Sequence, residues 1–461
     1  MNPPDRPNSE NYGAPQDAPV QASHTITAAM SPARAQEIVS SFDLRALPAD
    51  FYANPYPVYD LLRASQPVRQ MPDGSWFLTR YADLTAVYRN AKTFSSDKKI
   101  EFAPKYQHAP WQDGVAPASE APLFAHHTTS LVFNDPPLHT RVRKLIMGAL
   151  TRRAIREMEA GLVVLVDQLL DDIETTGGGD LIEHFASAIP IEVIGNLLGV
   201  PHADRAPLRG WSLAILSALE PALSPEQEAL GNRSVSEFLD YLKVLVADRR
   251  RSPGDPQHDV LTRLIQGEAD DKDGQLSEAE LLHNCIFILN AGHETTTNLI
   301  GNALVALQEW PHAKTELLQR IAHYRDDALA LEPHLDCAVD EFLRFESSNQ
   351  LGNRRATTAC TVGDVLLPAG ALVTLCIGAA NRDPAQFAQA DRLDLWRRDN
   401  RHLAFGFGIH QCAGLSLARL EGRIAIGRFL QRFPHYRLTG APVRGGRARF
   451  RGFLCAPFAT H

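Results

Sequence analysis

The 461-residue sequence has only six cysteines, and none of them form the close pairs typical of a zinc site. Six thiols are too few for a disulfide scaffold in a chain of this length, so we expect a reducing, cytoplasmic location. The formal net charge is -8, and no run of basic residues alternates with aromatic residues. This combination argues against a nucleic acid as the partner.

The amino-terminal end lacks the basic start and apolar stretch of a secretory signal or a membrane anchor. Residues 1–40 are instead rich in Pro, Ala, Ser, Asn and Gln, with few large apolar side chains. Such a composition offers too little apolar surface to bury, and it predicts a disordered leader. We therefore expect the folded part of the chain to cover residues 41–461, a length that by itself permits one large domain or two to three average ones.

Apolar residues recur at spacings of three and four over much of the chain after residue 136, which predicts a series of helices. They cover residues 138–150, 155–173, 181–198, 226–249, 260–265, 277–310 and 335–345. The helix over 277–310 is apolar around most of its circumference, so we expect it at the centre of the protein. Its Asn, His and Glu residues interrupt it too often for a membrane span.

Strand patterns are fewer and shorter than helical ones. Residues 357–379 show them around a Pro-Ala-Gly turn, and residues 76–78 are compatible with a hairpin that leads into a helix. Residues 95–134 are rich in Pro, Gly, Ala and His without a sustained period, which predicts a long loop beside the active site. These patterns together predict a mainly α fold with a minor β part.

One cysteine has an unusual setting near the carboxyl end. Segment 405–414, FGFGIHQCAG, surrounds Cys412 with glycines and precedes a helical pattern. Glycines let a flat macrocycle approach closely, and the start of a helix favours a negatively charged sulfur. A buried cysteine that acts as a small hydrophobe, the usual case, would not need this setting. The segment resembles the cytochrome P-450 family.

The resemblance extends from about residue 51 to the carboxyl end. It implies the cytochrome P-450 fold, in which haem b lies between the central helix and the helix that follows the cysteine. Cys412 would be the axial thiolate ligand of the iron. Phe405, Gly406 and Gly414 would lie against the haem.

The resemblance also implies cations for the haem propionates. His139 and Arg143, one helical turn apart, and His410 beside the cysteine match the family's positions. Arg354 matches a further one, and arginine is well suited to pairing with carboxylates. Arg355 is an alternative to Arg354, because neighbours on a strand point to opposite faces.

Segment 291–296, AGHETT, lies in the middle of the expected central helix, where glycine costs about 1 kcal/mol relative to alanine. By the resemblance, Ala291 and Gly292 open a groove for dioxygen. Thr295 would hydrogen-bond the oxygen that is being activated, and Glu294 would relay protons from solvent. A kinked helix whose threonine bonds its own backbone is the alternative.

Glu341 and Arg344 are three residues apart on one helix face, a spacing at which an exposed ion pair is common and contributes roughly 0.2–0.5 kcal/mol. The pair lies about seventy residues before Cys412, as the family's Glu-x-x-Arg pair does. The resemblance therefore implies a structural role for the pair beneath the haem.

The implied activity is that of a monooxygenase, which activates dioxygen with two electrons and hydroxylates or otherwise oxidises a hydrophobic small molecule. No Gly-x-Gly-x-x-Gly motif follows a strand, so the electrons would come from separate proteins, by resemblance a ferredoxin and its reductase. A peroxide-driven peroxygenase is an alternative, but the Glu294-Thr295 pair argues against it. A non-catalytic haem-thiolate sensor would need a second protein ligand, for which His293 is the nearest candidate.

One stretch departs from the family pattern. Many relatives have a proline shortly after the Glu-x-x-Arg helix, whereas residues 346–351 read ESSNQL here. This strand borders the substrate in relatives, so a relative's substrate cannot simply be carried over. The apolar character of the expected lining loops indicates only a class, such as a terpenoid, fatty acid or polyketide.

Overall fold

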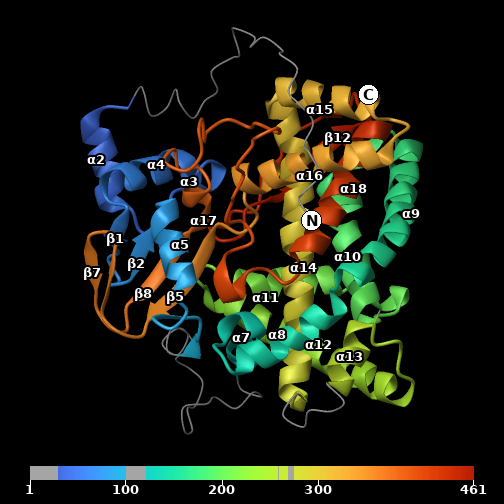
Figure 1. The fold of residues 1–461 in the computed structure, drawn as a ribbon, viewed down its shortest axis with the longest axis horizontal. Helices are drawn as coiled ribbons and strands as arrows, with labels where there is room; N and C mark the ends of the chain where they lie inside the picture. Colours follow the sequence, from blue (N-terminus) through green and yellow to red (C-terminus); the bar gives the residue numbers. More distant parts are fainter. Residues whose placement is uncertain (1–29, 100–120, 258, 268–274) are drawn as a thin grey trace, which may run out of the picture.

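The computed structural model describes residues 30–99, 121–257, 259–267 and 275–461. Helices form most of it, and the main sheet lies to one side of them (Figure 1). The α-helices are α2 (Pro32–Ser41), α3 (Ala49–Ala53), α4 (Tyr56–Ser65), α5 (Tyr81–Arg89), α7 (Pro122–Thr129), α8 (Leu138–Ala149), α9 (Arg152–Thr176), α10 (Ala188–Leu198), α11 (Leu208–Ser217), α12 (Pro225–Arg251), α13 (Val260–Gln266), α14 (Glu278–Glu309), α15 (Pro311–His323), α16 (Ala328–Phe345), α17 (Ile377–Ala380) and α18 (Leu415–Arg432). The predicted mainly α fold class is therefore confirmed.

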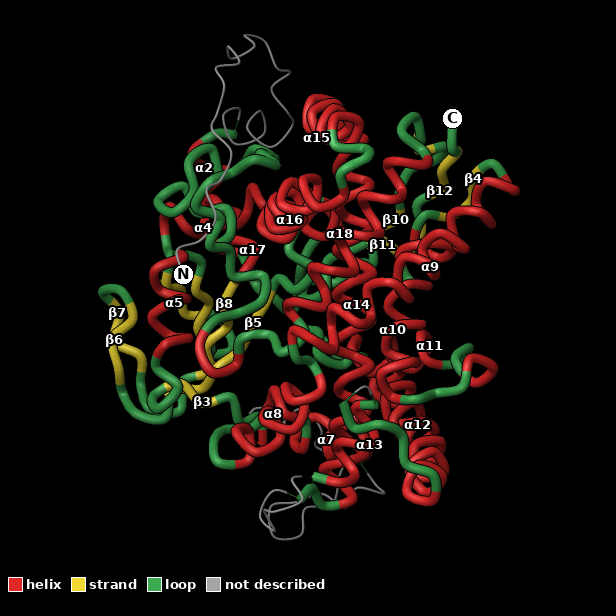
Figure 2. Tube along the Cα trace, turned by 45° about the vertical axis from the view of Figure 1, so that its right-hand side comes forward, coloured by secondary structure: helices red, strands yellow, loops and turns green. Residues whose placement is uncertain are grey.

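Short strands form the minor β part, seen in yellow in Figure 2. The strands are β1 (Val68–Gln70), β2 (Trp76–Leu78), β3 (Phe94–Ser95), β4 (Gly178–Asp180), β5 (Leu351–Ala356), β6 (Cys360–Val362), β7 (Val365–Leu367), β8 (Leu372–Cys376), β9 (Arg437–Leu438), β10 (Val443–Arg444), β11 (Phe453–Cys455) and β12 (Pro457–Ala459). The largest sheet has the order β1-β2-β8-β5-β3. In it, β1 and β2 form the expected antiparallel hairpin before α5, and β2 pairs in parallel with β8.

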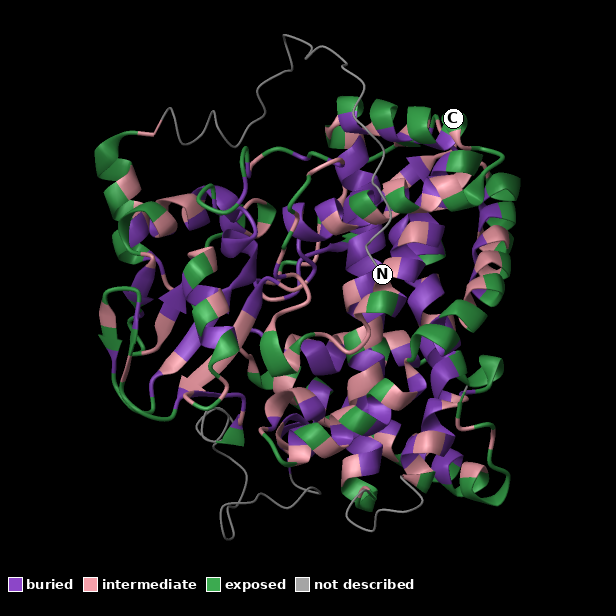
Figure 3. Cartoon of the chain, in the orientation of Figure 1, coloured by how far each residue is buried: buried purple, intermediate pink, exposed green. Residues whose placement is uncertain are grey.

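Helix α14 is the predicted central helix, and its bounds agree with the sequence pattern within one residue. It begins with a capping box, in which Ser277 and Glu280 each accept a hydrogen bond from the other's backbone N–H. Nearly all of its middle is buried, as the purple helix at the centre of Figure 3 shows. No described helix combines the length and the apolarity needed to cross a bilayer.

Two expectations about the chain's organisation need correction. The predicted leader overlaps α2, which packs Val39 into the core, so the disorder expected for its last ten residues is wrong; residues 1–29 lie outside the described part. The expected loop over 95–134 contains α7 and a 3-10 turn at Leu131–Phe133, while residues 100–120 are not described. Five of the eight residues in α7 are buried apolar or histidine side chains, so tertiary packing stabilises a helix that composition does not predict.

The helix expected at 335–345 begins earlier, at Ala328. A proline usually marks a helix boundary, but Pro333 lies inside α16. The side chain of Asp327 accepts a hydrogen bond from the backbone N–H of Ala330 at 3.0 Å and caps the earlier turn. Helix α15 was not predicted at all.

Candidate active site

The segment around Cys412 forms a tight loop before α18. The backbone N–H of Cys412 donates to the carbonyl oxygen of Phe405 at 2.9 Å, which closes the loop. Gly406 has φ +64° and Gly408 has φ +73°, a left-handed conformation that glycine adopts without strain. Helix α18 starts at Leu415, with Gly414 as its N-cap, so Cys412 stands two residues before the cap rather than in the first turn.

Two opposing influences act on the thiol of Cys412. Burial raises the pKa of this thiol above its usual value, although the backbone N–H of Gly414 and the charges of Arg143 and Arg419 act to lower it. Each of these three groups stabilises the anionic form of the sulfur. The surroundings therefore suit a thiolate whose charge is shared with a bound cation.

Four basic side chains from three separate parts of the chain gather beside this loop. The rings of His139 and His410 lie 4.1 Å apart, and Arg143 donates a 2.6 Å hydrogen bond to the carbonyl of Gln411. Burial, together with the charges of Arg354, His139 and Arg143, lowers the pKa of His410 to about 2. The charge of Arg354 lowers the pKa of both histidines. Arg354, rather than Arg355, is therefore favoured as the residue of β5 that belongs to this group.

This group fits an anionic partner such as the two carboxylates of a haem. The Nε2 atom of His410 is buried without a hydrogen-bond partner among the described residues. The charge of Asp135 acts to raise the pKa of His139. The carboxylate of Asp135, however, already accepts hydrogen bonds from the hydroxyl of Ser95 and the backbone N–H of Ser96. A Cβ added at Gly414 would meet no described atom within 4 Å, so that side of the loop is open to a flat ligand.

The middle of α14 exposes one narrow stripe. Between Leu281 and Leu307 the residues that are not fully buried are Phe287, Ile288, Ala291, Gly292 and Thr295. Their spacing places them on a single face of the helix. A partly accessible face at the centre of a protein is suited to a ligand, which agrees with the expected groove. Gly292 also has a packing role, because a Cβ there would meet Ile194 Cδ1 of α10 at 2.5 Å.

Glu294 and Thr295 are adjacent in sequence but their side chains have different partners. The hydroxyl of Thr295 lies on the stripe and donates to the carbonyl of Ala291 at 2.6 Å. Glu294 is buried and forms an ion pair with Arg447. In this structure Thr295 therefore bonds its own helix backbone, as the alternative interpretation from sequence expected. Because its hydroxyl lies on the stripe, it can still turn toward a ligand bound there.

Glu341 and Arg344 form a fully buried bidentate ion pair with two 2.8 Å contacts. The guanidinium also donates to the carbonyls of Asn381, Ala390 and Arg392, and the carboxylate accepts from Arg397, Asn400 and the N–H of Asp394. An exposed pair was the alternative from sequence, and it is wrong. The network fixes the chain that leads to the Cys412 loop.

Similarity to known proteins agrees with this arrangement. A cytochrome P450 family model matches residues 213–442. Cytochrome P450 107B1 of Saccharopolyspora erythraea is 38% identical over 80% of this chain and 84% of its own length. The chain belongs to the cytochrome P450 family. It is a P450 monooxygenase, and the family as a whole binds haem through a cysteine thiolate and requires dioxygen and a redox partner.

Two further relatives extend the comparison of this P450. The vitamin D(3) 25-hydroxylase of Pseudonocardia autotrophica is 37% identical over 84% of this chain and 89% of its own. The solved structure of P450BioI, in complex with an acyl carrier protein ligated to hexadec-9Z-enoic acid, has a TM-score of 0.78 and 30% identity. It covers 89% of this chain and 100% of that one.

His293, the nearest candidate for a second haem ligand, lies away from the stripe of this P450. It is buried, and burial lowers its pKa to about 3, with the charges of Arg209 and Arg447 acting in the same direction. Two residues correspond to about 200° around a helix, so His293 points to the side opposite Ala291. The position of His293 argues against the sensor hypothesis.

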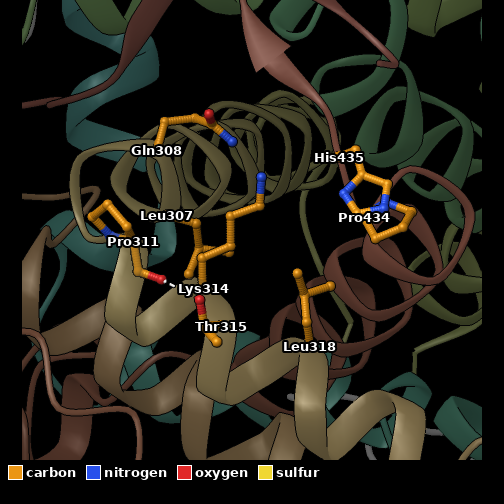
Figure 4. A pocket seen from close by; sticks show the side chains of 8 residues that line it. All are labelled: Leu307, Gln308, Pro311, Lys314, Thr315, Leu318, Pro434 and His435. Atoms are coloured by element: carbon orange, nitrogen blue, oxygen red, sulfur yellow. Dashed lines mark hydrogen bonds between the residues drawn. The ribbon is translucent and has the colours of Figure 1, made fainter.

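A surface pocket of 450 Å³ lies far along α14 from the stripe (Figure 4). Its lining residues come from the end of α14, from α15 and from the turn at Pro434 and His435. Lys314, one of these lining residues, donates to the carbonyl of Tyr436 at 3.1 Å. None of the predicted site residues lines this pocket, so it is separate from the predicted haem site.

Sequence reasoning missed two residues that contact the central segment of the P450. Arg447 pairs with Glu294, and the hydroxyl of Ser348 donates to the carbonyl of Thr295 at 2.8 Å. Ser348 lies in residues 346–351, whose sequence ESSNQL departs from the family pattern, so the sequence did contain a signal for this position. Arg447 stands among other arginines in a polar stretch, and nothing in its local pattern indicated a buried partner.

Proposed function

We propose that Cys412 is the thiolate ligand of haem b in this monooxygenase. The observation that carries the proposal is the convergence of His139, Arg143, Arg354 and His410 on the loop that holds this thiol. When bound, the haem supplies the redox chemistry by which dioxygen is activated. The purified, haem-loaded protein, reduced under carbon monoxide, should give the thiolate-type spectrum; an imidazole-type spectrum would contradict the assignment.

The residues around Cys412 have distinct roles in this proposal. The four basic groups would bind the propionates, and Arg143 also tethers the ligand loop through Gln411. Gly406 and Gly414 keep side chains away from the approaching macrocycle, and Phe405 holds the N–H of Cys412. We propose that residues 41–461 act as one haem-thiolate domain.

Thr295 and Glu294 are proposed to deliver protons to the site. The hydroxyl of Thr295 lies on the accessible stripe and could donate a hydrogen bond to a molecule bound there, while Glu294 is the neighbouring acid that would resupply the proton. Ala291 and Gly292 leave room beside Thr295. Protein side chains thus hold and move protons, while the rest of the stripe offers an apolar surface to the substrate.

Thr295→Ala should divert reducing equivalents into peroxide and water, with a loss of about tenfold or more in product formed per dioxygen consumed. Product, peroxide and dioxygen consumption measured together give this ratio. Thr297→Ala is the matched control, because Thr297 makes the same type of bond, to the carbonyl of His293 at 3.0 Å, on the buried side. Tight coupling retained in Thr295→Ala would count against the relay.

Arg354→Gln should release haem to an acceptor globin about tenfold faster than the parent, because a charge-assisted hydrogen bond to a carboxylate contributes about 1.5–3 kcal/mol. Arg355→Gln, at the next position of β5, should leave the release rate close to that of the parent. The rate is followed by the absorbance change as haem transfers. If Arg355→Gln released haem faster than Arg354→Gln, the propionate would be assigned to Arg355 instead.

The substrate is proposed to be a hydrophobic small molecule of the terpenoid, fatty-acid or polyketide class. One relative is named as a hydroxylase of vitamin D(3), and a solved neighbour holds a fatty acyl chain on a carrier protein, both of which are apolar. A binding screen over these classes, read from the change in the absorption spectrum of the haem-loaded protein when a compound binds, tests the class. Shifts given only by small polar compounds would exclude it.

The electrons are proposed to come from a ferredoxin and its reductase, in the cytoplasm. Arg398 and Arg401 are exposed on the segment that precedes the ligand loop and offer cations to an acidic electron carrier. Reconstitution with a ferredoxin and its reductase should support NADH- or NADPH-driven turnover that falls steeply as salt is added. Peroxide-driven turnover of equal rate would favour the peroxygenase alternative.

A further inference from the structure

The pocket of Figure 4 joins the end of α14 to the first part of α15 and to the turn that follows α18. Its volume of 450 Å³ falls within the range of roughly 300–1,000 Å³ that is typical of small-molecule sites. Pro311, Lys314, Thr315 and Leu318 recur at spacings of three and four, so one face of α15 forms a wall of the pocket.

Much of the pocket's lining is apolar. Leu307 of α14 is fully buried, and Leu318 and Pro434 are half-buried. Such side chains gain free energy when an apolar ligand removes their remaining surface from water. The pocket therefore favours a ligand with an apolar body.

Lys314 brings a charge into this apolar setting. Its Nζ atom donates to the carbonyl of Tyr436 at 3.1 Å and lies 4.1 Å from the centre of the Tyr436 ring. Burial lowers the pKa of Lys314, and no carboxylate in the described part of the chain acts to raise it. An ammonium has three N–H donors, so the bond to Tyr436 leaves donors for a ligand. Lys314 is thus a half-buried cation that an anionic ligand would complement.

The neighbouring polar groups already have partners in the protein. The amide nitrogen of Gln308 donates to the same carbonyl of Tyr436 at 3.1 Å, and the hydroxyl of Thr315 donates to the carbonyl of Pro311 at 2.9 Å. Figure 4 shows the amine of Lys314 between Gln308 and the ring of His435. A single ammonium with apolar surroundings suits a carboxylate better than a phosphate, which carries up to two charges and three acceptor oxygens.

We propose that this pocket binds a small organic carboxylate. The amine of Lys314 pairs with the carboxylate group, and Leu307, Leu318 and Pro434 contact an aromatic or aliphatic body. The ligand then links α14, α15 and the turn after α18, and it stabilises the folded protein by mass action. Because the pocket is separate from the predicted haem site, this inference does not rest on the proposed function.

The test titrates the intact haem-loaded protein with 2-naphthoate in a calorimeter, with and without an azole inhibitor that fills the haem site. The parent should bind 2-naphthoate about tenfold more tightly than 2-naphthamide, a neutral molecule of similar shape. Only the acid can form a charge-assisted hydrogen bond with Lys314. Both affinities should be the same whether or not the azole is present, and the midpoint of thermal unfolding should rise with the concentration of 2-naphthoate.

Lys314→Gln should bind 2-naphthoate about tenfold more weakly and should no longer distinguish it from 2-naphthamide. The bond from Gln308 to the carbonyl of Tyr436 remains in this variant, so the fold should be retained. Lys243→Gln is the matched control, because Lys243 is an exposed lysine of α12 that pairs with Asp240 at 2.8 Å. It should leave both affinities unchanged.

Leu318→Gln separates the apolar contact from the charge. It should weaken 2-naphthoate and 2-naphthamide by the same factor, because both use the apolar surface that this variant removes. Equal binding of the two compounds by the parent, or an undiminished preference for the acid in Lys314→Gln, would overturn the role of Lys314. Heat that disappears in the presence of the azole would place the ligand in the haem site instead. Displacement of 2-naphthoate by an equal concentration of inorganic phosphate would overturn the assignment to an organic carboxylate.

Discussion

Cys412→Ser should abolish the thiolate-type spectrum of the reduced carbon monoxide complex, and monooxygenase turnover should fall to background with it. A serine hydroxyl stays protonated where a cysteine becomes a thiolate, so the variant loses the anionic sulfur that Gly414, Arg143 and Arg419 stabilise. The measurement is the difference spectrum of reduced protein with and without carbon monoxide, at matched haem content.

Cys360→Ser is the control for this prediction. Cys360 is half-buried on β6, in the two-stranded sheet with β7, and has no place in the haem site. Its variant should keep both the spectrum and the turnover of the parent. An unchanged spectrum in Cys412→Ser would mean that another residue is the ligand, and the proposed function would need a different site.

Glu341→Gln should lower the free energy of unfolding by about 3–5 kcal/mol, the cost of removing one partner from a buried ion pair. The guanidiniums of Arg344 and Arg397 would lose their counter-ion, although the carbonyls that accept from Arg344 would remain. Chemical denaturation followed by far-ultraviolet circular dichroism gives the change. If this variant does not accumulate as folded protein, Glu341→Asp should show a smaller loss of the same sign.

Glu157→Gln provides a matched control. Its pair with Arg153 has the same 2.8 Å separation, but it is an exposed contact within α9. Removing an exposed pair costs about 0–1 kcal/mol, because solvent and salt already weaken it. Similar losses in Glu341→Gln and Glu157→Gln would show that burial adds nothing to the Glu341–Arg344 network.

The predicted helices were most accurate where apolar periodicity is long and uninterrupted. Helix α14 agrees within one residue because its apolar positions and its Ser277 cap indicate the same bounds. Helix α7 was missed because it is short and depends on contacts with other elements for its stability. The early start of α16 was missed because a cap at Asp327 outweighs the local effect of Pro333.

The candidate site, like the helices, could be predicted from the sequence only in part. The Cys412 loop and the central-helix segment could be found in sequence, because each concentrates rare residue choices in a few adjacent positions. The choice between Arg354 and Arg355 could not, because it depends on which face of β5 packs toward His139 and His410. The pairing of Glu294 with Arg447 joins residues 153 positions apart, and no local pattern encodes it.

The sequence by itself determined the fold class, the family and the candidate ligand of this P450. Each of these can be recognised from residues that lie close together in the sequence, such as glycines beside a thiol, a helical period of apolar residues, or an acid next to a threonine. Only the tertiary structure decided that Glu341 and Arg344 are fully buried, that His293 points away from the stripe, and that Glu294 pairs with Arg447. Burial and long-range charge pairing arise when distant segments pack together, and their energies depend on the surroundings that this packing creates.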